Sequence, residues 1–141
     1  MAAEYMDSWS PKAKAAANQA VLSYLGAFAI ITIHGISDEV LVTVNTRNDP
    51  LATIDAATGA IDFRFSDTPV LVTGSGTASY ATLRTSSGVA VRSMPCTVKS
   101  SISEEPFQIL SLQDYTGGVV TLKSLAFLAG DTYIISHMRI W

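Results

Sequence analysis

The sequence contains one cysteine, two histidines and few charged residues. Cys96 has no second cysteine to pair with, so the fold does not depend on internal disulfides, which suits synthesis in a reducing compartment. His34, His137 and Cys96 match no metal-ligand spacing, so we expect no metal and no other cofactor. The nine lysines and arginines are scattered and the formal net charge is −3, which argues against a nucleic-acid partner.

Long apolar runs are also missing. The most apolar stretch, residues 20–33, is shorter than the roughly twenty residues needed to cross a bilayer, and we expect no membrane partner. The overall composition is nevertheless apolar, with 48% hydrophobic and only 15% charged residues. A small soluble monomer does not readily bury that much apolar surface. The composition therefore predicts association with other chains, as a homo-oligomer for which we favour a trimer.

Residues 11–141 are expected to form a single β-rich domain with an opening helix. Ser10 is a typical helix N-cap, and Pro11 suits the first helical position. Alanines and larger apolar residues then recur at helical spacing until Gly26, which predicts a helix over residues 11–25. A chain of 141 residues has room for one such domain.

After Gly26 the pattern changes to short segments rich in β-branched and aromatic residues, separated by turn-forming residues. The expected strands cover residues 27–34, 40–45, 51–55, 61–65, 70–73, 78–84, 89–93, 107–112, 119–128 and 132–140. Strands at this spacing, without a second helical pattern, predict a mainly β fold. We expect an antiparallel β-sandwich or barrel with one N-terminal α-helix.

Residues 1–10 form an arm in front of the expected helix. Tyr5, Met6 and Trp9 sit there among polar residues, a composition suited to anchoring on another surface through a few large side chains. The same composition also fits a frayed terminus.

The expected last strand, residues 132–140, is apolar on both faces. Alternation places Ile140 on one face, and Tyr133 and Trp141 on the other. Such a strand is either central in its sheet or covered by a second subunit. With the arm, it completes the predicted protein interface: Tyr5, Met6, Trp9, Tyr133, Ile140 and Trp141.

Patterns typical of catalysis are weak in this sequence. Gly74, Ser75 and Gly76 lack the spacing of a nucleophile elbow and lead into a strand rather than a helix. The two histidines are interpreted as surface or interface residues, and the cysteine as a small core residue.

Three acids, Asp55, Asp62 and Asp67, crowd around the turn at Gly59. They would indicate an enzyme, such as a glycoside hydrolase, only if they converged in one pocket. We therefore expect a protein without enzymatic activity.

Five segments follow the alanine-rich helix in a fixed order. They are AFAIITI (27–33), LAT (51–53), GTASYATL (76–83), GVAV (88–91) and GGVVTLKS (117–124). This order resembles small structural proteins of tailed bacteriophage virions over nearly the whole chain. The departures are that Tyr80 and Arg84 stand where family members carry a large aromatic residue and an arginine, and that the loop after Gly35 is short.

The resemblance implies a virion component without enzymatic activity, assembled in the cytoplasm of the host bacterium. The first interpretation is a capsid decoration or cement protein that binds the major capsid protein. A neck, tail or fibre-attachment protein that binds other virion proteins would share the composition and fold. A glycan- or receptor-binding β-sandwich is a third interpretation because aromatic rings stack on sugars, although both tryptophans are close to the ends of the chain.

Overall fold

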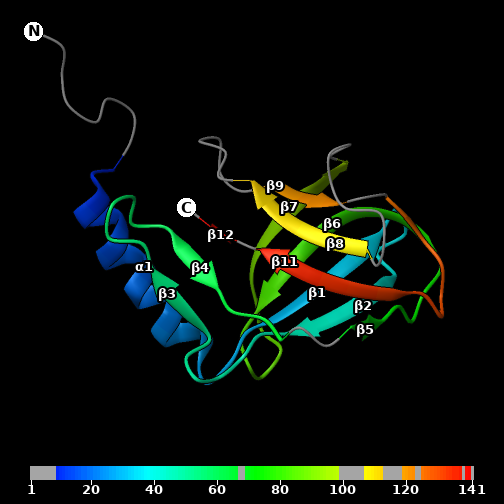
Figure 1. The fold of residues 1–141 in the computed structure, drawn as a ribbon, viewed down its shortest axis with the longest axis horizontal. Coiled ribbons are helices and arrows are strands. Elements are labelled where there is room, and N and C mark those ends of the chain that lie inside the picture. Colours follow the sequence, from blue (N-terminus) through cyan, green and yellow to red (C-terminus); the bar gives the residue numbers. More distant parts are fainter. Residues whose placement is uncertain are drawn as a thin grey trace, which may run out of the picture.

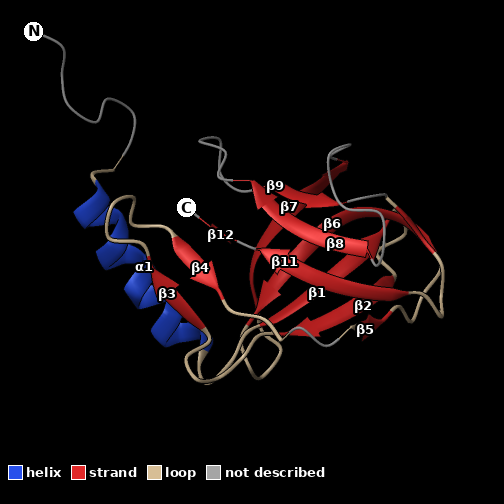
Figure 2. Cartoon of the chain, in the orientation of Figure 1, coloured by secondary structure: helices blue, strands red, loops and turns tan. Residues whose placement is uncertain are grey.

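The computed structural model of the chain has one helix and a predominance of strands (Figures 1 and 2). It describes residues 9–66, 69–98, 107–112, 119–122, 125–137 and 139–140, with side chains for residues 9–66, 69–96 and 125–132. The predicted class, a mainly β fold with one N-terminal α-helix, is confirmed.

Helix α1 (Pro11–Leu25) begins and ends where local signals predict. The Ser10 hydroxyl accepts a hydrogen bond from the Ala13 N–H at 3.2 Å, and Pro11 stands in the first turn, where no backbone donor is needed. Gly26 ends the helix with a φ of +91°, a conformation that glycine adopts without strain.

Twelve strands are present in the described residues. They are β1 (Ile30–Gly35), β2 (Val40–Asn45), β3 (Ala52–Ile54), β4 (Ile61–Phe63), β5 (Val70–Leu71), β6 (Gly76–Arg84), β7 (Ala90–Val98), β8 (Phe107–Leu112), β9 (Val119–Leu122), β10 (Ala126–Phe127), β11 (Thr132–His137) and β12 (Arg139–Ile140). Most lie within the expected segments, because β-branched residues favour extended backbone and the intervening glycines and polar residues favour turns.

Nine of these strands form a large sheet in the order β2-β1-β6-β7-β9-β8-β11-β5, with β10 beside β6. Its neighbours are antiparallel, as predicted, except for the parallel pairs β7–β9 and β8–β11. The sheet curls until its two ends approach each other, and the backbone N–H groups of Thr73 and Gly74 donate to the Leu41 carbonyl at 2.9 and 3.0 Å. The arrangement is sandwich-like rather than a closed barrel.

A second sheet has the order β12-β4-β3 and lies at the end of the molecule that carries α1 (Figure 1). Helix α1 contacts β3 of this sheet. Buried side chains from the helix and from both sheets form one hydrophobic cluster, which therefore fixes the helix and the small sheet to the large one. Its fully buried large members are Leu25, Ile31, Ile33, Leu41, Val42, Ile61, Leu83 and Met94.

The C-terminal strands differ from the prediction. The segment expected as one strand over residues 119–128 divides into β9, which pairs with β7 and β8, and β10, which pairs with β6. The segment expected over residues 132–140 divides into β11 in the large sheet and β12 in the small one. Both segments change neighbours part-way, so a single alternation of faces does not run through either of them. Because β11 lies between β8 and β5, it is internal to its sheet rather than an edge strand.

The Asn18 side chain joins the helix to the turn between β3 and β4. Its Nδ2 donates to the Gly59 carbonyl at 2.7 Å, and Asn18 is only 8% exposed. We expect Asn18→Ala to lower the free energy of unfolding by about 1–3 kcal/mol, because a buried carbonyl loses its donor. Urea denaturation measures this, with the exposed Gln19→Ala as the matched control. Equal effects of the two changes would contradict the role given to Asn18.

Candidate functional site

The predicted interface residues fall in different parts of the fold. Tyr5, Met6 and Trp141 lie outside the described residues. Trp9, directly before the N-cap of α1, is 76% exposed. Its indole is therefore available for contact with another molecule.

Two further predicted interface residues belong to different sheets. Ile140 pairs with Ile61 of β4 in the small sheet, at the end of the molecule that carries α1. Tyr133 pairs with Phe107 and Val70 in the large sheet. The structure therefore places Ile140 at the same end as Trp9 and places Tyr133 elsewhere.

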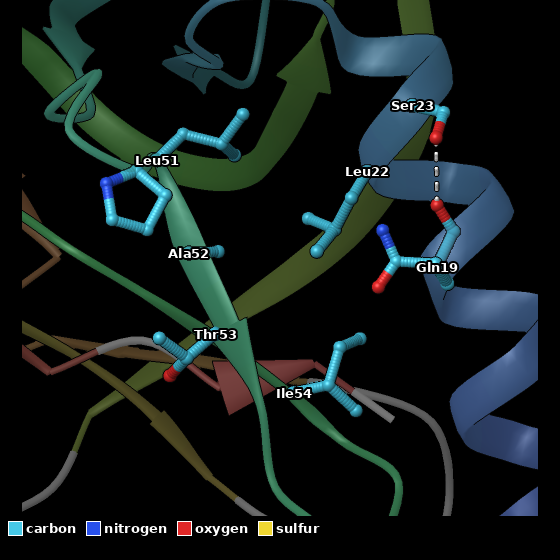
Figure 3. Close-up of a pocket in the computed structure, with 8 residues that line it drawn as sticks. Gln19, Leu22, Ser23, Leu51, Ala52, Thr53 and Ile54 are labelled. Atoms are coloured by element: carbon cyan, nitrogen blue, oxygen red, sulfur yellow. Dashed lines mark hydrogen bonds between the residues drawn. The ribbon is translucent and has the colours of Figure 1, made fainter.

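A surface groove between α1 and β3, which the sequence reasoning missed, has a volume of about 500 Å³ (Figure 3). No sequence motif marks it, because it forms only when a helix and a strand 25 or more residues apart in the chain pack together. The residues that line it are Gln19, Leu22, Ser23, Pro50, Leu51, Ala52, Thr53 and Ile54. None of these side chains is charged, so the groove suits an uncharged or apolar group.

Helix α1 and strand β3 form the two walls of the groove. Gln19, Leu22 and Ser23 are neighbours on one face of the helix, and Leu22 points toward β3 (Figure 3). The Ser23 hydroxyl donates to the Gln19 carbonyl at 3.2 Å. On the opposite wall Ile54 points toward the helix (Figure 3). The walls are therefore apolar in the middle, with amide and hydroxyl groups along the helix.

Strand β3 is an edge strand, because the small sheet ends with it. On its paired side, the Leu51 carbonyl accepts a hydrogen bond from the Arg64 N–H, directly after β4, at 2.9 Å. The Asp55 N–H donates to the Ala60 carbonyl, directly before β4, at 2.9 Å. Alternate residues of an antiparallel strand bond to the same neighbour. The backbone groups of Ala52 and Ile54 consequently point away from β4 along the open edge of the small sheet, whereas the Ile54 side chain points toward α1 (Figure 3).

Beyond the Ile54 end of the groove, the turn that carries Gly59 packs against the first half of α1. This glycine has a φ of +79°, and a Cβ atom on it would lie 2.5 Å from the Pro11 carbonyl oxygen and 2.8 Å from the Ala15 nitrogen. Only glycine permits so close an approach between the turn and the helix. With the hydrogen bond from Asn18, this contact fixes the distance between α1 and β3.

The other end of the groove, at Pro50, is flanked by two arginines. Arg47 forms two hydrogen bonds with the Asp49 carboxylate, at 2.9 and 3.0 Å, and holds the pKa of Asp49 below its usual value. Arg64 donates to the Asp49 carbonyl at 2.6 Å and to the Pro50 carbonyl at 3.3 Å. Two guanidinium groups therefore stand beside one carboxylate at this end.

His34 is only 5% exposed, so its interpretation as a surface or interface histidine is wrong. Its Nδ1 lies 3.2 Å from the Asp38 carbonyl oxygen, and its Nε2 lies 2.7 Å from the hydroxyl of Thr32, which also accepts from Arg84 at 3.1 Å. The ring stacks on Tyr80 with centroids 4.7 Å apart. Tyr80 donates to the Asp38 carboxylate at 2.9 Å, which raises the pKa of Tyr80. These contacts hold the loop after β1, where Asp38 has a φ of +65°.

The acids around Gly59 do not make a carboxylate pocket from the residues described. Asp55 accepts a hydrogen bond from the Ala57 N–H at 2.8 Å, a turn-stabilising contact. Asp62 lies on β4 opposite Thr53, and Asp67 lies outside the described residues. Neither Asp55 nor Asp62 lines the groove between α1 and β3 or another cavity, of about 300 Å³, beside Phe28.

Within the part of the chain that the structure describes, no three His, Cys, Asp or Glu residues are placed to hold a metal ion. No helix in that part has both the length and the apolar character needed to cross a membrane. Comparisons of the chain with protein-family models, with curated proteins and with solved structures found no match. The groove between α1 and β3 and the exposed apolar residues are therefore the features on which a functional proposal rests.

Cys96 is half-buried on β7 and packs against the hydrophobic core. Burial raises the pKa of its thiol to about 12. The thiolate is the nucleophilic form, so this cysteine is poorly reactive at neutral pH.

We expect Cys96 in the folded protein to react with Ellman's reagent at pH 8 on the order of a hundredfold more slowly than in urea, where the thiol regains its ordinary pKa. Stopped-flow absorbance measures both rates. A glutathione sample at each urea concentration controls for the effect of urea on the reagent. Equal rates for folded and unfolded protein would show that Cys96 is an accessible thiolate.

Proposed function

We propose that this chain is a non-enzymatic structural protein of a tailed-bacteriophage virion. Its proposed role is that of a capsid decoration, or cement, protein that binds the major capsid protein and stabilises the capsid lattice. We also propose that its copies associate, as a trimer in the favoured case, and that they act in the virion after assembly in the bacterial cytoplasm.

The observation that carries this proposal is the number of large apolar side chains left exposed on a fold with a well-buried core. Among the residues whose side chains the structure describes, those at least 44% exposed are Trp9, Tyr24, Ile36, Val40, Leu71, Val89 and Leu128. Single exposed apolar residues are ordinary, but adjacent ones indicate contact surfaces. In a protein shell, contacts with neighbouring subunits bury such exposed apolar residues.

Two of these residues lie in neighbouring segments. Leu71 is in β5, and Leu128 is in the turn before β11. Between the segments, the Val72 N–H donates to the Asp131 carbonyl at 2.8 Å, and the Gly130 N–H donates to the Val72 carbonyl at 2.9 Å. This part of the large sheet supports a contact between copies, distant in the fold from the helix-bearing end (Figure 1).

Trp9 supports a second contact, with the capsid. Trp9 directly precedes the N-cap of helix α1 and is exposed to solvent, so the helix holds it at a defined position on the surface. An indole is among the side chains that contribute most to protein interfaces. A protein that binds only the assembled lattice shifts the assembly equilibrium toward the lattice, which is the proposed mechanism of stabilisation.

The first test is the copy number of the chain in purified virions, from quantitative mass spectrometry with the major capsid protein as the internal reference. We expect a ratio comparable to that of the capsid protein. A ratio of a few per cent would overturn the cement role in favour of a neck, tail or fibre-attachment protein. Absence from virions would overturn the structural role, and a glycan array would then test the receptor-binding alternative.

The second test removes the arm. We expect deletion of residues 1–10 to weaken binding to purified capsids at least about tenfold, because the anchoring aromatic residues are lost. Co-sedimentation with capsids measures binding, and circular dichroism checks that the deleted protein is folded. The point change Trp9→Ala should reproduce part of the loss, whereas Ser79→Ala, at an exposed position of β6 outside the exposed apolar set, serves as its control. Unchanged binding after deletion would remove the arm from the proposed interface.

A further inference from the structure

We propose that the groove between α1 and β3 is a self-association site that binds the Tyr24 side chain of a second copy of this chain. A two-fold axis relates the two copies, so each inserts its Tyr24 into the groove of the other. The contact forms without the capsid. It goes beyond the proposed function because it assigns an occupant to the groove and joins copies at a different surface from Leu71 and Leu128.

Tyr24 is the first reason. It lies in the last turn of α1, and it is 62% exposed. Its hydroxyl forms no hydrogen bond within the part of the chain that the structure describes. A tyrosine gains free energy when its ring leaves water, provided that its hydroxyl finds a hydrogen-bond partner. Tyr24 therefore suits a site that combines an apolar wall with polar groups.

The groove offers this combination. Leu22 and Ile54 approach its centre from opposite walls, and the Gln19 amide and the Ser23 hydroxyl lie along the helix (Figure 3). Both polar groups can accept a hydrogen bond from a phenol. No charged side chain lines the groove, so an uncharged ring enters it without burying an unpaired charge.

The chain's own Tyr24 does not occupy the groove. Ser23 lines it, and the next residue of an α-helix is rotated by about 100° around the axis. Tyr24 therefore lies on a neighbouring side of α1, where its high exposure shows that nothing in the same copy covers it. A tyrosine that enters this groove comes from another molecule.

The position of Tyr24 beside the groove favours a second copy as that molecule. A projecting side chain and a groove that are neighbours on one surface pair reciprocally when a two-fold axis passes between them. Helical geometry places Ala20 between Tyr24 and Ser23 on the exposed side of α1. Its small side chain allows the two helices to approach closely at the axis.

Charge supports the same occupant. Helix α1 has no charged residue after Lys14, and the groove has none. Two identical surfaces that meet here therefore bring no like charges together. The exposed face of a surface helix is usually charged, so an uncharged face over the second half of α1 is typical of a contact.

The buried area determines the strength of the contact. Two tyrosines and equal areas of groove surface remove roughly 600–1000 Å² from water. Stable interfaces bury at least about 1200 Å². We therefore expect a weak, concentration-dependent association of free copies.

The first test uses the full chain with the photo-reactive residue p-benzoyl-phenylalanine in place of Tyr24. Copies labelled with ¹⁴N and ¹⁵N are mixed at high concentration, irradiated and digested, and mass spectrometry shows which residues are joined and whether they belong to different copies. We expect cross-links between copies at residues 19–23 and 50–54. Cross-links between copies elsewhere, cross-links within one copy, or no cross-links would overturn the proposal.

Variants of Tyr24 test the occupant. Sedimentation equilibrium over a range of concentrations measures the association. We expect Tyr24→Ala to weaken it at least about tenfold, because the inserted ring is lost. Tyr24→Phe keeps the ring and should weaken it only about threefold, through the lost hydrogen bond. Val89→Ala, at another exposed apolar position, is the control, and an equal loss from this variant would contradict the role of Tyr24.

A matched pair of helix variants tests the groove. Ser23→Glu places a carboxylate in the uncharged groove, and we expect it to weaken the association at least about tenfold. Ala13→Glu adds the same charge at an exposed position about 15 Å along the helix, and should leave the association within about twofold. Equal effects of the two variants would overturn the assignment. Thermal melts of both variants check that α1 is intact.

These tests are independent of the proposed function. Cross-links in solution together with absence from virions would refute the proposed function alone. A virion copy number comparable to that of the capsid protein, without cross-links between copies, would refute this inference alone.

Discussion

The hydrogen bond from the buried Asn18 side chain to the Gly59 carbonyl sets the geometry of the helix-bearing end of the molecule. Only two residues of helix α1, Asn18 and Leu25, are buried, so the hydrophobic cluster holds the helix through a narrow apolar face that also includes the half-buried Val21 and Leu22. The Asn18 contact and the close packing of Gly59 on the first half of the helix tie it to the hairpin of β3 and β4. Without them the spacing between α1 and β3, and with it the groove, would not be defined.

Local sequence signals were sufficient for the parts of the fold that depend on local physics. The cap at Ser10, the proline after it and the glycine at position 26 set both ends of the helix, because each acts through its own backbone conformation or hydrogen bond. Runs of β-branched residues located β1 and β2 for the same reason. The division of residues 119–128 and 132–140 between different neighbours could not be predicted, since it depends on which distant strands pair.

The candidate site shows the same limit. Trp9 could be selected from the sequence because a large aromatic residue in a polar arm stands out, and it is exposed in the structure. The groove could not, since Leu22 and Ile54 are unremarkable until the chain folds them to face each other. His34 was misread for a related reason: Tyr80, on which its ring stacks, comes from a strand more than forty residues away, and the sequence shows only that His34 is at a strand end.

The split between β11 and β12 has a consequence for biosynthesis. Residues 132–137 fill the gap between β8 and β5 in the large sheet, and residues 139–140 complete the small sheet beside β4. Both sheets are therefore completed by a segment that is synthesised after all their other strands. Until this segment is in place, β5 and β8 lack their partner β11, and β4 lacks its partner β12. The two sheets are therefore expected to close in one late folding event, because the same segment completes both of them. A chain that stops before residue 132 would have neither sheet complete.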